Sequence, residues 1–165
     1  MFGSIFGSFH GLPIHALVVH GAVILTPVAA LLGILMLRPA WRMSLRWPLV
    51  AATAVATGTV YVARSSGVIL KEALGDQIKG NITGKAVAHH QALANRLWIW
   101  LLVFLLVAVI VALLLPRLNS PLAGGVAAIA VAALAIVIIV LVVQTGEAGT
   151  KARWNPDGSF DYSGS

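Results

Sequence analysis

Four long runs of apolar residues, each almost free of charge, constrain this chain more than any other feature. They predict helices over about residues 13–37, 47–66, 85–115 and 121–144. A run of about 20 apolar residues can cross a hydrocarbon core of about 30 Å as a helix. Only 10% of the residues are charged, against about 25% in a soluble domain. The sequence therefore predicts an all-α integral membrane four-helix bundle, folded as one domain over residues 1–154.

The connections and the tail carry the polar residues. Residues 69–78 place Leu70 and Leu74 on one side and Lys71 and Glu72 mostly on the other, which predicts a short interfacial helix between the second and third spans. The third span covers about 31 residues, roughly 46 Å at 1.5 Å per residue, so its polar N-terminal end should protrude from the membrane. The tail, 155–165, is polar and rich in glycine and is expected to be mobile.

Four of the eleven basic residues lie in the short connections at one end of the predicted bundle, and the other seven lie in longer, acid-containing segments towards the opposite end. The connections after the first and third spans contain Arg38, Arg42, Arg46 and Arg117 but no acidic residue. Because short connections rich in Lys and Arg stay in the cytoplasm, we expect a multi-pass protein of the bacterial inner membrane with both termini outside. The basic composition then marks the membrane surface, with the lipid bilayer and not nucleic acid as the partner. The acidic residues all fall at the outer end: Glu72, Asp76, Glu147, Asp157 and Asp161.

The histidines gather at the same outer end: His10, His15, His20, His89 and His90. Counting along each helix from its cytoplasmic end places His15 at about 35 Å, His90 at about 40 Å and Glu147 at about 39 Å. The same count places His20 deeper, at about 27 Å. His15, His90 and Glu147 are therefore expected within about one helical turn of a common level.

This histidine cluster has three interpretations. Ionisable residues within a membrane usually mark function, and imidazole binds Fe, Cu and Zn. The first interpretation is a b-type haem held by imidazoles of the first and third spans, with Glu147 accepting a hydrogen bond from one of them. The second is a Cu or Zn ion bound by His15, His90 and Glu147. In the third, the histidines are headgroup anchors and no cofactor is bound.

The spacing within each histidine pair limits one site to one member of the pair. His15 and His20 are five residues apart, about 140° around a helix at about 100° per residue, so they face different ways. The adjacent His89 and His90 diverge for the same reason. Depth favours His15 and His90 as the ligand pair, with His20 and His89 as the alternates.

Other signals of chemistry are few. The chain has no cysteine, which excludes disulfides and thiolate metal sites. It contains no P-loop, HExxH or nucleophile-elbow motif, so we predict no catalytic residue and do not favour an enzyme. Tyr61 and Arg64, near the outer end of the second span, could serve a haem propionate or a quinone headgroup. An aromatic ring and a cation at this depth are more often interfacial anchors.

Three stretches resemble one family of membrane proteins. They are PIHALVVHG at 13–21, AHHQALANRLW at 88–98 and TGEAGTKARW at 145–154. Together they are similar to the DUF2231 family of four-helix bacterial membrane proteins, particularly its actinobacterial members, over about residues 11–154. The resemblance implies that the motif histidines of the family are His15, His20 and one of His89 and His90.

The chain departs from this family at two positions. Many relatives have proline where this chain has Ala16, and many have histidine where it has Glu147. The activity of the family is not settled, but some relatives are joined to iron–sulfur or redox domains, which implies electron-transfer chemistry.

Two functions of different classes follow from these observations. One is a haem b- or metal-binding module linked to membrane electron transfer. The other is a structural or assembly accessory subunit of a larger, respiratory membrane complex, with no cofactor of its own. The helix over 121–144 is apolar on every side and needs lipid, a partner protein or a second copy around it. A transporter is disfavoured because the centres of the last three spans carry no ionisable residue.

Overall fold

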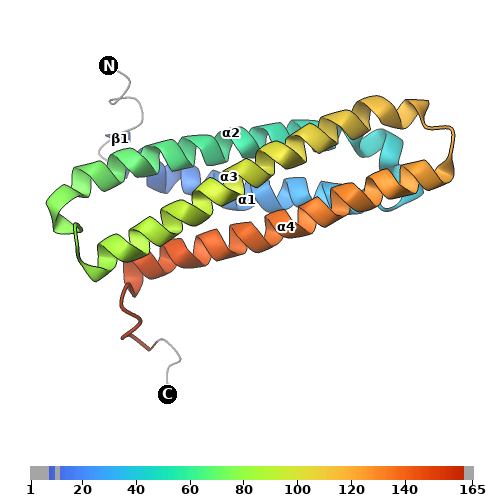
Figure 1. The fold of residues 1–165 in the computed structure, drawn as a ribbon. Helices are drawn as coiled ribbons and strands as arrows, with labels where there is room; N and C mark the ends of the chain where they lie inside the picture. The colour runs from blue at the N-terminus through green and yellow to red at the C-terminus, as the bar shows by residue number, and fades with distance from the viewer. Residues whose placement is uncertain (1–7, 10–11, 162–165) are drawn as a thin grey trace.

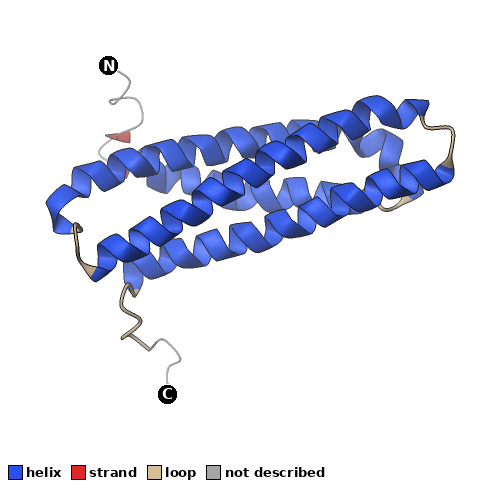
Figure 2. Cartoon of the chain, in the orientation of Figure 1, coloured by secondary structure: helices blue, strands red, loops and turns tan. Residues whose placement is uncertain are grey.

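The computed structural model describes residues 8–9 and 12–161, which form a bundle of long helices that run alternately up and down (Figure 1). A pair of two-residue antiparallel strands, β1 (Ser8–Phe9) and β2 (Leu12–Pro13), precedes the first helix (Figure 2). The predicted all-α membrane bundle is confirmed. Its long helices are α1 (Ile14–Leu35), α2 (Arg42–Leu74), α3 (Ile82–Leu114) and α4 (Pro121–Trp154).

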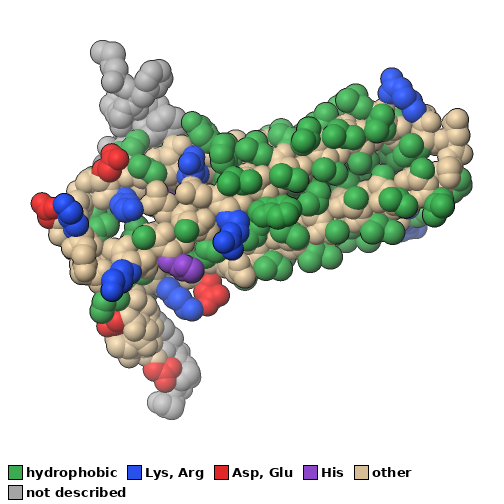
Figure 3. All heavy atoms as spheres, viewed as in Figure 1, with side chains coloured by type: hydrophobic (Ala, Val, Ile, Leu, Met, Phe, Trp, Pro, Cys, Tyr) green, Lys and Arg blue, Asp and Glu red, His purple; other side chains and the backbone are tan. Residues whose placement is uncertain are grey.

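Three helical segments in the described part of the chain are long and apolar enough to cross a membrane. They are Ile14–Leu35, Ile82–Arg117 and Pro121–Trp154. Apolar side chains cover the middle of the bundle, whereas charged side chains collect near its ends (Figure 3). Because water is absent from a bilayer core, such a surface suits lipid tails. The protein is an integral membrane protein.

Each helix contacts two neighbours in the ring of four. α1 lies beside α2 and α4, and α3 also lies beside α2 and α4. α1 and α3 therefore face each other across the diagonal, and a side chain from either can reach the centre of the bundle. This arrangement positions the candidate site.

Small residues let the helices approach closely at mid-bundle, as is usual in membranes. Ala29, Ala56 and Ala135 are fully buried. Phe104 of α3 is also fully buried, and a Cβ added to Gly33 of α1 would lie 2.9 Å from its Cζ atom. Phe104 therefore fills the space that the missing side chain at position 33 leaves.

The segment predicted as a separate interfacial helix, 69–78, is instead largely the end of α2. This helix continues without a break to Leu74, and a short 3-10 turn, Gly75–Gln77, follows it. The helix continues because its inner face still packs: Ser66 is buried, and Lys71 donates from Nζ to Oε1 of Gln91 on α3 at 2.9 Å. Of the apolar residues of this segment, Ile78 is buried and Leu70 and Leu74 are half-buried, so part of the apolar face also packs against the bundle.

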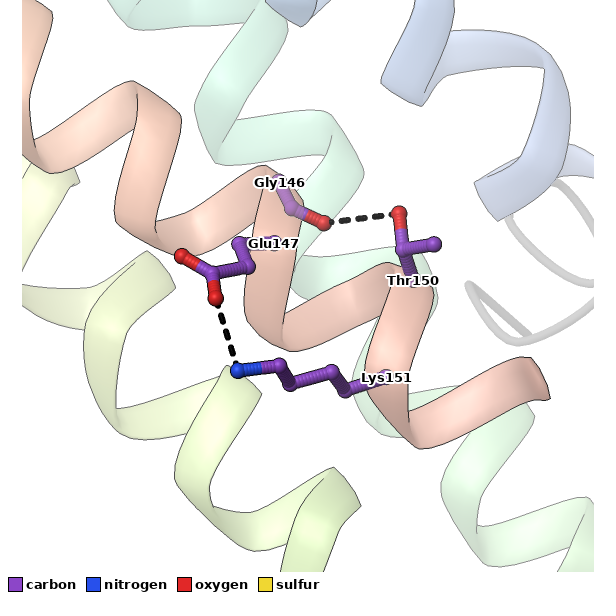
Figure 4. A network of polar contacts seen from close by, with 4 residues as sticks. All are labelled: Gly146, Glu147, Thr150 and Lys151. Carbon is purple, nitrogen blue, oxygen red and sulfur yellow. Dashed lines mark hydrogen bonds and ion pairs between the residues drawn. The ribbon is translucent and has the colours of Figure 1, made fainter. Parts of the chain in front are cut away.

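α4 extends ten residues beyond position 144, where the apolar run predicted its end, and stops at Trp154. The polar residues of this extension bond within the helix. The Glu147 carboxylate and Lys151 Nζ form an ion pair at 2.7 Å, and the Thr150 hydroxyl donates to the Gly146 carbonyl at 3.0 Å (Figure 4). Ala148 of the same extension is buried, so the extension belongs to the packed bundle.

The described part of the tail forms a local turn after α4. Asn155 donates from Nδ2 to the Phe160 carbonyl at 2.8 Å. The Ser159 hydroxyl and backbone N–H donate to the Asp157 carboxylate, which holds the pKa of Asp157 below its usual value. Residues 155–160 are therefore locally ordered, and residues 162–165 lie outside the described part.

Candidate functional site: an imidazole pair

His15 of α1 and His90 of α3 meet inside the polar end of the bundle. Their ring centroids lie 6.4 Å apart and the ring planes are inclined by 78°. Both side chains are half-buried. The diagonal relation of α1 and α3 lets two helices that are not neighbours in the ring present imidazoles to each other.

Each imidazole is held by a backbone carbonyl of a neighbouring helix. The Nδ1 atom of His15 lies 2.8 Å from the carbonyl oxygen of Ala63 on α2. The Nδ1 atom of His90 lies 2.9 Å from the carbonyl oxygen of Thr145 on α4. A carbonyl oxygen only accepts hydrogen bonds, so Nδ1 must carry the proton in both rings. When such a ring is neutral, its Nε2 atom has a lone pair that can bind a ligand.

A glycine lies beside each imidazole, on the same helix as the carbonyl that the imidazole contacts. Gly67 follows Ala63 by one helical turn, and Gly149 follows Thr145 by the same four residues. A Cβ added to Gly67 would lie 3.1 Å from Cε1 of His15, and one added to Gly149 would lie 3.0 Å from Cε1 of His90. Any larger residue at these positions would press on the ring. We call each carbonyl and its glycine an imidazole seat.

The two imidazole seats have the same arrangement in the two halves of the chain. In the hairpin of α1 and α2, the first helix supplies the histidine and the second supplies the seat. The hairpin of α3 and α4 repeats this division. The site is thus pseudo-symmetric, although no repeat is evident in the sequence.

The other predicted histidines lie apart from this pair. His20 is exposed, and its Nδ1 bonds the Ala16 carbonyl of its own helix at 2.7 Å. His89 is also exposed. His10 lies outside the described residues. The structure therefore places His15 and His90, and not the alternates, at the centre of the site.

Glu147 lies near the same level but does not face the pair. It is exposed and binds Lys151 (Figure 4), and it is two residues from Gly149, about 200° around the helix. Backbone carbonyls therefore accept the hydrogen bonds from the imidazoles, a role that the sequence predicted for Glu147. Among the described residues, no group of three or more His, Asp or Glu side chains is placed to hold a metal ion.

Tyr61 and Arg64 are engaged at the interface of α2 and α3. The Nε atom of Arg64 donates to Oδ1 of Asn95, and its guanidinium carbon lies 5.1 Å from the centroid of the Trp98 ring. The Tyr61 ring lies 5.7 Å from the same indole. These contacts hold α2 against α3. Arg64 directly follows Ala63, whose carbonyl contacts His15.

The candidate cofactors differ in the number of ligands that they need from the protein. Haem iron takes four nitrogens from the porphyrin and needs only two axial ligands from the protein, which the two Nε2 atoms match. A protein-bound zinc ion has three or four protein ligands, and the described residues supply two. The residues present therefore fit haem better than a Zn ion or a Cu ion with a carboxylate ligand.

The seats were not predicted from the sequence. Thr145 and Gly149 lie in the stretch TGEAGTKARW, which indicated the family resemblance but did not predict a contact with a histidine. Ala63 and Gly67 carry no signal, since an alanine and a glycine in a small-residue helix are ordinary. Only the packing of α1 on α2 shows their role.

The fold and the imidazole pair together define the class of the protein: an integral membrane helical bundle with paired histidines at its polar end. A family model described as a predicted membrane protein (DUF2231) matches residues 11–158. The chain belongs to this family, as its three motif stretches predicted. No match was found among curated proteins or among solved structures.

Proposed function

We propose that this protein is a small redox module of the membrane, with His15 and His90 as axial ligands of a b-type haem. The observation that supports it is the pair of imidazoles, each with Nδ1–H donated to a carbonyl and Nε2 left free. Ligating histidines almost always donate their other ring N–H in this way. A histidine that served only as a headgroup anchor would not need a glycine and a carbonyl from another helix.

The haem would supply one-electron chemistry, and the protein would supply orientation. The carbonyls of Ala63 and Thr145 hold each ring in one tautomer and raise the basicity of its Nε2. Gly67 and Gly149 let α2 and α4 approach the rings, which keeps water away from their faces. The inclusion of two histidines and no carboxylate leaves a neutral donor set.

The visible spectrum of the purified protein tests this proposal. Expressed with sufficient haem, the wild type should show the Soret and α/β bands of a bis-imidazole haem. His15→Ala and His90→Ala should each abolish haem retention while the protein remains monodisperse in detergent. His20→Ala and His89→Ala are matched controls, because these exposed rings lie outside the pair, and both should retain haem.

Two results would overturn the proposal and favour a different function. A colourless wild type with one equivalent of copper or zinc by elemental analysis would make the pair a metal-ion site completed by ligands from outside the described residues. A colourless and metal-free wild type would favour the accessory-subunit function, in which the pair only locks the four helices together.

A further inference from the structure

A second candidate site lies where α2 gives way to α3, apart from the imidazole pair. A pocket of about 320 Å³ opens there between the end of α2, the connecting loop and the first turns of α3. Its lining includes Lys71, Lys79, Lys85 and Asn81, together with glycines of the loop and helix start. None of these residues contacts His15 or His90 through the bonds described above.

Three lysines line this pocket, and Lys79 and Lys85 are exposed. Among the described residues none of them forms an ion pair with a carboxylate; the Nζ atom of Lys71 donates to the neutral amide oxygen of Gln91. The nearest acids in sequence, Glu72 and Asp76, are exposed and also form no ion pair within the described chain. Like charges that share a pocket repel one another unless an anion binds between them.

The backbone around the pocket is shaped for close approach. Gly80 has φ of 79°, a conformation that residues with a side chain rarely adopt. A Cβ on Gly84 would lie 2.1 Å from the Ile78 carbonyl oxygen. The loop therefore folds tightly against the start of α3, and it brings Lys79 and Lys85 to the same pocket.

The pocket lies at the depth of lipid headgroups. Lys85 precedes Leu114, the last residue of α3, by 29 positions, or about 44 Å along the helix. A bilayer with its headgroups is about 40–45 Å thick. Lysine side chains close to a membrane surface are attracted to anionic lipid headgroups.

We propose that this lysine pocket binds a phosphate-bearing anion, presented either by an anionic phospholipid headgroup or by a soluble phosphate. The exposed ammonium groups of Lys79 and Lys85 would supply most of the charge, and Lys71, held by Gln91, lines the same pocket. The inference does not depend on haem, so it stands or falls separately from the proposed function.

The thermal midpoint of the protein in a neutral detergent tests the proposal. Phosphatidylglycerol, phosphatidylcholine or inorganic phosphate would be added at constant ionic strength. A ligand that binds the folded state raises its stability, so we expect phosphatidylglycerol to raise the midpoint by roughly 5 °C in the wild type. Phosphatidylcholine, which has no net charge, should have a much smaller effect.

Lys79→Gln/Lys85→Gln should lose most of this shift. Arg96→Gln/Arg153→Gln is the matched control: it removes the same charge from exposed residues outside the pocket and should keep the shift. These variants spare Lys71, whose bond to Gln91 supports the fold. Native mass spectrometry of retained phosphatidylglycerol gives a second readout that does not depend on the midpoint.

The two ligand sources give different results. A shift with phosphatidylglycerol alone identifies a lipid headgroup, whereas an equal shift with inorganic phosphate identifies a soluble phosphate, and both support the site. The proposal is overturned if no phosphate compound shifts the wild type, or if the control pair loses as much of the shift as the pocket pair.

Discussion

At the scale of single residues, Gly67 and Gly149 matter because they have no side chain. Each lies where an imidazole passes closest to the next helix, and a Cβ would approach ring atoms to 3.1 Å or 3.0 Å. Gly146, on the same helix as Gly149, has nothing within 4 Å of the corresponding position. The same substitution at Gly146 and at Gly149 should therefore have different effects.

Gly149→Ala should displace the His90 ring and lower haem retention several-fold, and Gly67→Ala should do the same through His15. Gly146→Ala should leave retention unchanged and stabilise α4 by about 1 kcal/mol, because alanine favours helix over glycine. The haem-to-protein ratio and the thermal midpoint measure both effects. Equal retention in Gly149→Ala and Gly146→Ala would show that the seat does not orient the ring.

At the scale of the helices, the bundle depends on one aromatic side chain that bridges the diagonal. Phe104 of α3 lies against Gly33 of α1, and the Ala135 Cβ and Val131 Cγ1 atoms of α4 would each be 3.3 Å from a Cβ on that glycine. Three helices thus meet at Gly33. The imidazole pair lies further along the same two diagonal helices, so this packing helps to set the distance between them.

Phe104→Ala should destabilise the bundle by about 3–5 kcal/mol, because it leaves a large cavity where three helices meet. Leu106→Ala is the control, since Leu106 is 60% exposed on the same helix and faces lipid; it should cost much less. Unfolding in mixed micelles measures the difference. Comparable losses in both variants would mean that Phe104 is not a packing centre.

At the scale of the whole molecule, the two ends of the bundle differ in charge. Arg38, Arg42, Arg46 and Arg117 lie at the end formed by the α1–α2 and α3–α4 connections, and the described acidic residues lie at the other end. In the view of Figure 3, red side chains appear only at the left end of the bundle, where α2 is joined to α3. By the positive-inside rule, this asymmetry predicts that the end with the acidic residues, and the imidazole pair with it, lies on the outer side of the membrane.

Single cysteines test this orientation directly, because the chain has none of its own. Ser159→Cys, in the exposed tail, should react with a membrane-impermeant maleimide in intact cells. Asn119→Cys, in the exposed α3–α4 connection, should react only after the membrane is permeabilised. The opposite pattern would invert the orientation and place the imidazole pair in the cytoplasm.

The residues themselves determine the class of the protein and the level of each side chain along its helix. The four runs contain few charges and are long enough to cross a bilayer, so they predict membrane-spanning helices. The rise per residue is constant, so counting alone could bring His15 and His90 to one level.

Rotation about each helix axis was decided only by the tertiary structure. Adjacent residues differ by about 100° around a helix, and the packing of α3 turns His90 inward and His89 outward. The same rotation turns Glu147 away from the pair while Gly149 faces it. The carbonyls of Ala63 and Thr145 became partners only through helix pairing, and the lysine pocket formed only where α2 and α3 join. Backbone groups and glycines carry no chemical signature in a sequence, so their part in the site depends on which helix lies beside them.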